Sequence, residues 1–256
     1  MNDLRAALVE CARKIDDYRG RRKINEDNTK ATLVEVVLRA LGWDTSNADE
    51  VEREYRHASR SKPADYALIL ADRPQHPIAV VEAKALGTNV SDYAIVSQVL
   101  SYATDTGAPC AVITNGDEWR IYNAHAAVAG PDRFYRAVRI SDSGNRPGEE
   151  LLRVLLLLSK DQLRAGNVQR LWEAATYDQQ VSSVLSKLFD PADPLNKGLL
   201  DTLSPLLPTL SRQALEQSVA RMRATFEFSP TTPIPAKPAA PAPARATRVA
   251  AADGQT

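Results

Sequence analysis

Cysteine is scarce in this chain, and the charges leave no excess of either sign. The two cysteines, Cys11 and Cys110, stand far apart in a sequence of 256 residues. They fit reduced core thiols and exclude a disulfide framework or a cysteine-rich zinc site. The 32 acidic and 32 basic residues cancel, which excludes a protein that binds nucleic acid through its overall positive charge. Any contact with DNA must therefore be local.

Long apolar runs and nucleotide-binding loops are missing as well. No run approaches the roughly 20 apolar residues that cross a bilayer, and the opening MNDLRAALVECARK lacks the apolar core of a signal peptide. We therefore expect no membrane association and, given the reduced thiols, a cytoplasmic location. The sequence has no GxxxxGK[ST] loop and thus no ATP-binding motif. With 44% hydrophobic residues it can bury a sizeable core in one or two domains.

What the sequence does contain is an apolar octapeptide, IAVVEAKA over residues 78–85, that carries Glu82 and Lys84. Alternate side chains of a strand point to the same face, so these two residues emerge side by side. Charged groups at the end of a buried strand are costly unless they are paired or bind a metal ion. A structural ion pair is the simpler interpretation, and a catalytic site is the alternative.

A second apolar segment, PADYALIL over residues 63–70, predicts another strand and begins with Asp65. A hairpin through the loop ADRPQHP would lay this strand antiparallel against the octapeptide and bring Asp65 opposite Glu82 and Lys84. Two carboxylates would then meet a lysine, and carboxylate oxygens are ligands that Mg²⁺ prefers. Asp65 could also be a simple turn residue.

Helical periodicity surrounds the two strands. Apolar residues at helical spacing predict a helix in residues 25–44, where Glu35 lies among apolar neighbours and faces either a site or water. Residues 91–104 predict an amphipathic helix on which Gln98 and Tyr102, four apart, share one face. A polar helix flank is the alternative for that pair. The remaining predicted elements are an N-terminal helix ending near Gly20 and strands over residues 51–56, 110–114, 118–123 and 134–140.

The sequence pattern changes at residue 149, from mixed strands and helices to helices alone. Leucine-rich helical patterns over residues 149–228, broken by proline and glycine, predict a helical appendage to a first domain of residues 1–148. The helices expected there cover residues 151–158, 168–175, 181–189 and 210–226. Their apolar stripes would be exposed if each helix stood alone, so they must pack on one another, on the first domain or on a second copy. We expect a homodimer or a partner subunit docked through this appendage. The Pro/Ala-rich residues 229–256 have too little apolar bulk to fold and are expected to form a disordered tail.

Taken in order, these segments resemble a known family. NEDNTKATLVEVVLRALGWD is similar to the opening helix of the N-terminal nuclease domain of type I restriction enzyme restriction subunits, members of the PD-(D/E)xK superfamily. PADYALIL and VVEAKA resemble its catalytic strands, SQVLSYA its Gln-x-x-x-Tyr helix, and VITNGDEWRIY its closing hairpin. The resemblance covers residues 25–124. It implies a restriction-endonuclease-like α/β core, with a central mixed sheet flanked by helices.

The resemblance also implies roles for individual residues. Asp65 and Glu82 would bind Mg²⁺ together with the carbonyl of Ala83, and Mn²⁺ is expected to substitute. Lys84 would orient or activate the attacking water and stabilise charge on the phosphate. Glu35 would be an outer acidic ligand.

Four polar residues are expected to contact DNA. Gln98 and Tyr102 would brace the lysine or the scissile strand, and Arg60 and Lys62, in the polar loop before the first catalytic strand, would join them in binding DNA. Ala64 separates the proline from the aspartate of the family pattern, and the ATP-driven motor that accompanies the family domain is absent from this sequence.

The implied function is that of a stand-alone, Mg²⁺-dependent DNA endonuclease, in a restriction or phage-defence setting. Two other classes stay open. One is a DNA- or protein-binding module without a motor, directed by a partner chain of a larger defence complex. The other is a structural interaction protein with an inactive site. A metal-dependent cleavage assay separates the first class from the other two.

Overall fold

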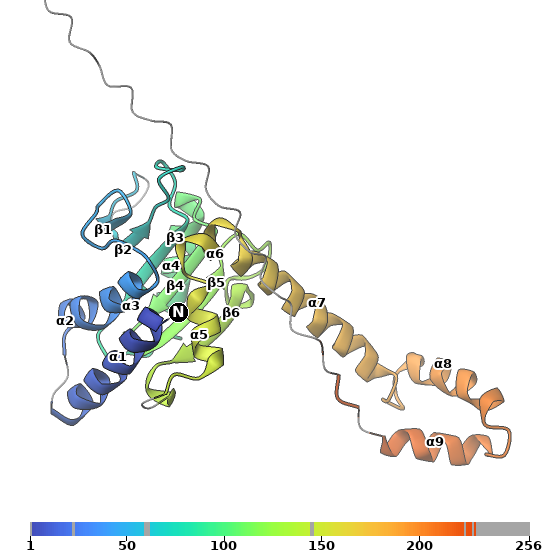
Figure 1. Cartoon of the computed structure of the whole chain (residues 1–256). Coiled ribbons are helices and arrows are strands. Elements are labelled where there is room, and N and C mark those ends of the chain that lie inside the picture. Colours follow the sequence, from blue (N-terminus) through green and yellow to red (C-terminus); the bar gives the residue numbers. More distant parts are fainter. Residues whose placement is uncertain are drawn as a thin grey trace, which may run out of the picture.

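A six-stranded mixed sheet with helices on both faces forms the body of the protein (Figure 1). The computed structural model describes residues 2–21, 24–58, 62–143, 146–222, 224–226 and 228. The predicted α/β class, with a central mixed sheet flanked by helices, is thereby confirmed. The expected DNA contact Arg60 and the expected tail of residues 229–256 lie outside the described residues.

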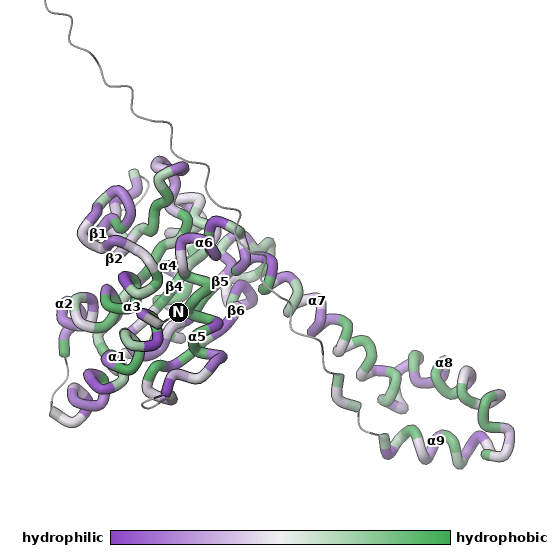
Figure 2. Tube along the Cα trace, in the orientation of Figure 1, coloured by the Kyte–Doolittle hydropathy of each residue, from purple (hydrophilic) through white to green (hydrophobic). Residues whose placement is uncertain are grey.

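The strands lie side by side in the order in which they occur along the chain. All neighbours are antiparallel except β3 and β4, which are parallel and joined by the crossover helix α4 (Tyr93–Thr106). Hydrophobic residues gather along the central strands (Figure 2). The six predicted strands are all present, as β1 (Val51–Tyr55), β2 (Ala64–Leu68), β3 (Ala79–Ala83), β4 (Cys110–Thr114), β5 (Glu118–Asn123) and β6 (Phe134–Arg139).

One face of the sheet is covered by N-terminal helices. The helix predicted over residues 25–44 is divided into α2 (Glu26–Thr29), a π-helical turn η1 (Lys30–Val34) and α3 (Glu35–Ala40). The side chain of Asn25 caps its start by accepting a hydrogen bond from the backbone of Asn28 at 2.9 Å. A π-helical turn inserts an extra residue into a helix and is frequent at functional sites. The long helix α1 (Asn2–Arg21) packs beside α3 in the same layer.

The opposite face of the sheet is covered by α4. Its apolar side packs on alternate residues of β3 and β4, namely Val80, Ala111 and Ile113. The helix begins where the side chain of Asp92 accepts a hydrogen bond from the backbone of Ala94 at 2.8 Å. The helix predicted over residues 91–104 is therefore present, shifted by two residues.

The C-terminal half divides differently from the prediction. The expected boundary at residue 149 coincides with the start of α5 (Glu149–Leu156), yet α5, α6 (Lys160–Arg164) and the first turns of α7 (Asn167–Lys187) belong to the same core as the sheet. The indole nitrogen of Trp43 donates to the carbonyl of Leu158 at 2.8 Å, which ties α3 to this layer. Periodicity shows that a helix has a buried face, but it does not show what that face packs on.

Beyond Trp172 the chain leaves the body. The helices predicted over residues 168–175 and 181–189 are one continuous helix, α7, which leads away from the sheet to α8 and α9 (Figure 1). Pro194, which suggested a break, stands in the first turn of α8. Backbone N–H groups in a first turn make no hydrogen bond within the helix, so a proline there costs none. The elements not yet given are α8 (Pro194–Leu203), α9 (Arg212–Arg221) and the 3-10 turns η2 (Gly130–Arg133), η3 (Ser141–Ser143) and η4 (Ser204–Leu206).

Among the described residues, no helix has the length and apolar character needed to cross a membrane.

Candidate active site

The β2–β3 hairpin brings the two predicted carboxylates together. Tyr66 pairs with Val81, and continuing that antiparallel register by one residue places Asp65 opposite Glu82, as the sequence predicted. Oδ2 of Asp65 accepts a hydrogen bond from the backbone N–H of Ala83 at 2.7 Å. Both carboxylates are 8% exposed. They therefore meet at one end of the hairpin in a largely buried setting.

Lys84 extends this cluster. Its ammonium lies 2.5 Å from Oε1 of Glu82, so the two side chains do emerge side by side. Burial alone would lower the pKa of Lys84, but the contact with Glu82 raises it above its ordinary value. Burial and then the charge of Asp65 raise the pKa of Glu82 in spite of its contact with Lys84. The contact with Glu82 thus favours the charged form of Lys84, whereas burial and the nearby carboxylate of Asp65 disfavour the ionised form of Glu82.

A second lysine, which the sequence analysis missed, lies at the same place. Lys30 is the first residue of the π-helical turn, and its ammonium pairs with Oδ1 of Asp65 and lies 3.3 Å from Glu26 and 3.4 Å from Glu54. Burial would lower its pKa, but hydrogen bonding to Asp65 and the charges of Asp65 and Glu26 raise it. No sequence pattern near Lys30 signals this role, because Glu54 and Asp65 come from separate strands, and the pairing with Glu26 is an ordinary contact between residues four apart on a helix.

The acidic residue that the helical segment contributes is Glu26, not Glu35. Oε2 of Glu26 lies 3.8 Å from the ammonium of Lys84. The carboxylate of Glu35 is instead engaged by Arg53 at 2.9 Å, Tyr66 at 3.3 Å and Arg39 at 3.4 Å. Glu26 stands in the first turn of a helix, where an acid is already explained by the helix dipole, so its position alone gave no functional signal.

Glu54 adds strain beside the site. It lies between two paired residues of β1, and the register places it across from Asp65 on β2. Its φ of 50° puts it in the left-handed region, and it is the one non-glycine residue with a positive φ among those described. Such strain persists where surrounding contacts over-determine the conformation. Here the contact is with Lys30, which itself holds Asp65.

Gln98 and Tyr102 approach from α4. Both line a narrow crevice with Glu82, so the helix does cover the sheet beside the cluster. The hydroxyl of Tyr102 donates to the carbonyl of Tyr55 at 2.5 Å and accepts from the backbone of His57 at 3.1 Å. Gln98 is exposed, as is Lys62 in the loop that leads into β2. Tyr102 thus anchors the end of β1, and Gln98 is the freer polar group.

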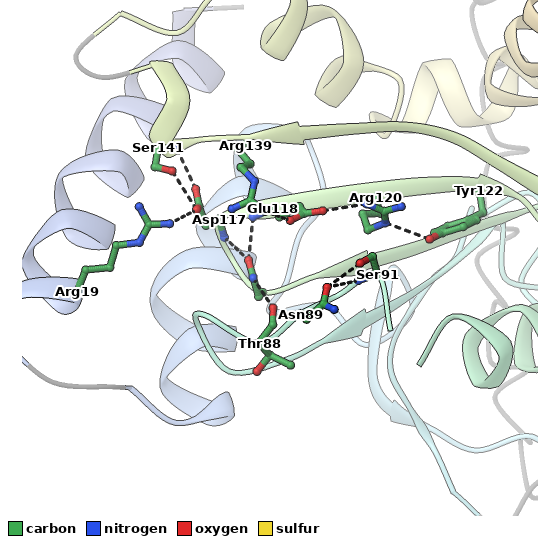
Figure 3. A network of polar contacts seen from close by, with 11 residues as sticks. Arg19, Thr88, Asn89, Ser91, Asp117, Glu118, Arg120, Tyr122, Arg139 and Ser141 are labelled. Atoms are coloured by element: carbon green, nitrogen blue, oxygen red, sulfur yellow. Dashed lines mark hydrogen bonds and ion pairs between the residues drawn. The ribbon is translucent and has the colours of Figure 1, made fainter. Parts of the chain in front are cut away.

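The loop after Lys84 is fixed on two sides. The hydroxyl of Thr29 accepts a hydrogen bond from the backbone N–H of Leu86 at 3.1 Å. The side-chain amide of Asn115 donates to the carbonyl of Thr88 at 2.8 Å (Figure 3). Gly116 follows with a φ of 83°, and a Cβ built there would lie 2.7 Å from Cδ1 of Leu33. Only glycine fits this turn, because both the backbone conformation and the space demand it.

A buried acid, Asp117, anchors the same turn to distant elements. Its carboxylate accepts hydrogen bonds from Arg19 of α1 at 2.5 Å and from the backbone and hydroxyl of Ser141 at 2.8 and 2.9 Å (Figure 3). The sequence predicts this residue only as part of a hairpin. Its partners lie 98 and 24 residues away, which explains why no local pattern revealed it.

The chemistry of the cluster fits a divalent cation. Its ion pairs join four carboxylates, those of Glu26, Glu54, Asp65 and Glu82, to the two ammonium groups of Lys30 and Lys84. Asp65 and Glu82 are buried, whereas the side chains of Glu26 and Glu54 are 40% and 61% exposed. Among the described residues of the cluster negative charge is in excess, which a hard cation would relieve. In the described part of the chain no three Asp, Glu, His or Cys side chains are arranged to hold a metal. A bound cation would take Asp65, Glu82, a backbone carbonyl and solvent.

No family model, curated protein or solved structure matched the chain. The structure by itself defines the class: an α/β protein whose β2–β3 hairpin ends in a cluster of carboxylates and lysines.

Proposed function

We propose that this chain is a divalent-metal-dependent DNA endonuclease with a restriction-endonuclease-like core. The observation that carries the proposal is the meeting of Asp65, Glu82 and Lys84 at one end of an antiparallel hairpin, with the lysine ammonium 2.5 Å from Glu82. A structural ion pair alone would need one acid and one base. Asp65, a second buried carboxylate beside the Glu82–Lys84 pair, favours a site built for a cation and an anionic substrate.

Each residue has a chemical task in this proposal. Asp65 and Glu82, with the carbonyl of Ala83, would hold Mg²⁺ or Mn²⁺, which supplies charge neutralisation and a more acidic bound water. Lys84, kept charged by its contact with Glu82, orients the attacking water and stabilises negative charge on the phosphate. The water oxygen forms a bond to phosphorus and the water proton passes to solvent, while the bond to the leaving oxygen breaks and that oxygen takes up a proton from solvent to leave as an alcohol.

The surrounding contacts hold these groups in place. The backbone of Ala83 fixes Asp65, and the backbone of Lys84 donates to the carbonyl of Thr114 at 2.8 Å, which keeps the end of β3 aligned with β4. Because the loop that follows is braced by Thr29 and Asn115, the lysine has a rigid base. Gln98, which is exposed and lines a crevice with Glu82, and Lys62, which is exposed in the loop before β2, would contact a nucleic-acid strand in this proposal.

Cleavage of supercoiled plasmid and of single-stranded DNA tests the proposal. We expect nicked or linear products with Mg²⁺ or Mn²⁺ and none with EDTA, and Asp65→Asn should lose both metal binding and cleavage. Glu150→Gln, a carboxylate change on the exposed surface of α5, is the matched control and should cleave normally. If folded wild-type protein binds DNA and metal but leaves both substrates intact, the chain is a binding module and the proposal is wrong.

A further inference from the structure

The far half of α7 carries an apolar stripe without a cover. Within α7 the buried residues are Asn167, Val168 and Trp172, and none follows Trp172. Tyr177 is 60% exposed, Val181 48% and Val184 52%. The helices α8 and α9 lie beyond the far end of α7 rather than along it, and they pack on each other through Leu200, Leu215 and Val219 (Figure 1). They leave the stripe open.

The stripe has the spacing of a coiled-coil seam. Counting from Ala174, apolar residues recur after three, four, three and four residues, at Tyr177, Val181, Val184 and Leu188. That alternation is the heptad pattern of a helix that pairs with another helix, whereas a helix packed on a globular core shows a broader stripe. The segment from Ala174 to Leu188 is about 22 Å long at 1.5 Å per residue.

The charges beside the seam select the partner and its direction. In an antiparallel pair of α7 helices, setting Val181 against Tyr177 of a second copy also sets Ala174 against Val184 of that copy. The flanking Glu173 then faces Lys187 of the second copy, and the two-fold symmetry repeats this opposite-charge contact. In a parallel pair Glu173 would face Asp178 at two repulsive contacts, whereas the antiparallel pair brings Asp178 near Asp178 of the second copy once, at the two-fold axis, so opposite-charge contacts prevail only in the antiparallel pair. Glu173 and Lys187 are both exposed.

We infer that the chain forms a two-fold dimer through an antiparallel pairing of α7 with the α7 of a second copy. The inference does not rest on the proposed nuclease activity, and all of its measurements report mass or proximity. The partner is a second copy of this chain, because α7 itself supplies both the matched apolar layers and the complementary charges.

Light scattering coupled to size exclusion on the full chain is the first test, with a dimer expected at micromolar concentration. Lys187→Glu should weaken the dimer by about tenfold or more, because it places two like charges together at each of two contacts. Adding Glu173→Lys to that variant should restore the dimer. Lys197→Glu, an exposed lysine of α8 away from the seam, is the control and should not change the mass.

Cross-linking decides the direction of the helices. Gln180 lies at the two-fold axis of the antiparallel pairing, so Gln180→Cys should cross-link to itself with a short bis-maleimide, whereas Ser183→Cys, on the outer side of the helix, should not. The native Cys11 and Cys110 are buried, so they give little background. A monomer at all concentrations, a dimer unaffected by Lys187→Glu, or a dimer in which Gln180→Cys fails to cross-link would each overturn the inference.

Discussion

The ammonium of Lys30 lies against Oδ1 of Asp65, the carboxylate that we propose binds a metal ion. The second oxygen of Asp65 accepts the backbone N–H of Ala83 at 2.7 Å. Because both oxygens are engaged, a cation that binds Asp65 must share or displace the lysine. Lys30 is therefore the counter-ion of Asp65 and would compete with a metal ion for the same acid.

Replacing Lys30 should make the melting temperature of the protein depend more strongly on bound Mg²⁺. In Lys30→Met, Asp65 loses its counter-ion in a largely buried place, so the melting temperature in EDTA should fall. The rise in melting temperature on adding Mg²⁺ should be larger than in the wild type, because binding to the folded state is no longer opposed. Lys14→Met, which removes a lysine paired with Glu10 on α1, is the control. Equal Mg²⁺ effects in Lys30→Met and wild type would contradict the competition.

Glu82 should make the metal-free protein less stable as the pH rises. Burial and the charge of Asp65 raise its pKa above the ordinary 4.5, so the folded state holds this proton more tightly than the unfolded state. The stability it contributes is complete below the unfolded pKa and is lost as the pH rises through the folded pKa. Urea unfolding in EDTA between pH 4.5 and neutrality should show a shallower decline for Glu82→Gln than for wild type. Identical pH slopes for the two proteins would show that folding does not raise the pKa of Glu82.

The turn at Gly116 should tolerate no side chain. Gly116→Ala meets Leu33 at 2.7 Å and keeps a positive φ, so we expect a loss of about 1–2 kcal/mol from the conformation and about 1–3 kcal/mol more from overpacking. Gly107→Ala, with a φ of 72° and open space around it, isolates the conformational part. Chemical denaturation of both variants checks this, and equal losses would rule out the steric contribution of Leu33.

Tyr102 and Gln98 share a face of α4 but should behave differently. Tyr102→Phe removes the hydroxyl that joins the carbonyl of Tyr55 to the backbone of His57, so unfolding should become easier by about 1–2 kcal/mol. Gln98→Ala alters an exposed side chain and should change stability by less than about 0.5 kcal/mol, yet slow cleavage strongly. Paired melting and cleavage assays separate the two roles. A large stability loss in Gln98→Ala would place it in the packing instead.

Strand positions and the register of the hairpin could be predicted because they depend on local patterns. Apolar runs bounded by turn residues located β2 and β3, and a single antiparallel alignment then set Asp65 opposite Glu82. The placement of Lys84 beside Glu82 followed from strand geometry alone. These parts of the site need only the sequence of one hairpin.

Other parts of the site depend on contacts between distant segments. Lys30 joins Asp65 only because a π-helical turn directs it there, and Glu26 rather than Glu35 approaches Lys84 because the helix is divided at that turn. A regular helix drawn through residues 25–44 carries no sign of this. Both halves of α7 were predicted to be helical, but its continuity was not, because the exposed stripe between them has no partner within the described chain to account for it.

The cleavage activity of Lys84→Ala tests the central claim most directly. The ammonium of Lys84 lies 2.5 Å from Glu82. Its removal leaves the two proposed carboxylate ligands in place while deleting the group that we propose orients water and stabilises the phosphate charge. We predict that Lys84→Ala folds, binds Mg²⁺ nearly as the wild type does and cleaves plasmid at a rate below a few per cent of wild type, on the order of the losses expected when a general catalytic group is removed. A folded Lys84→Ala protein that cleaves at the wild-type rate would contradict the account.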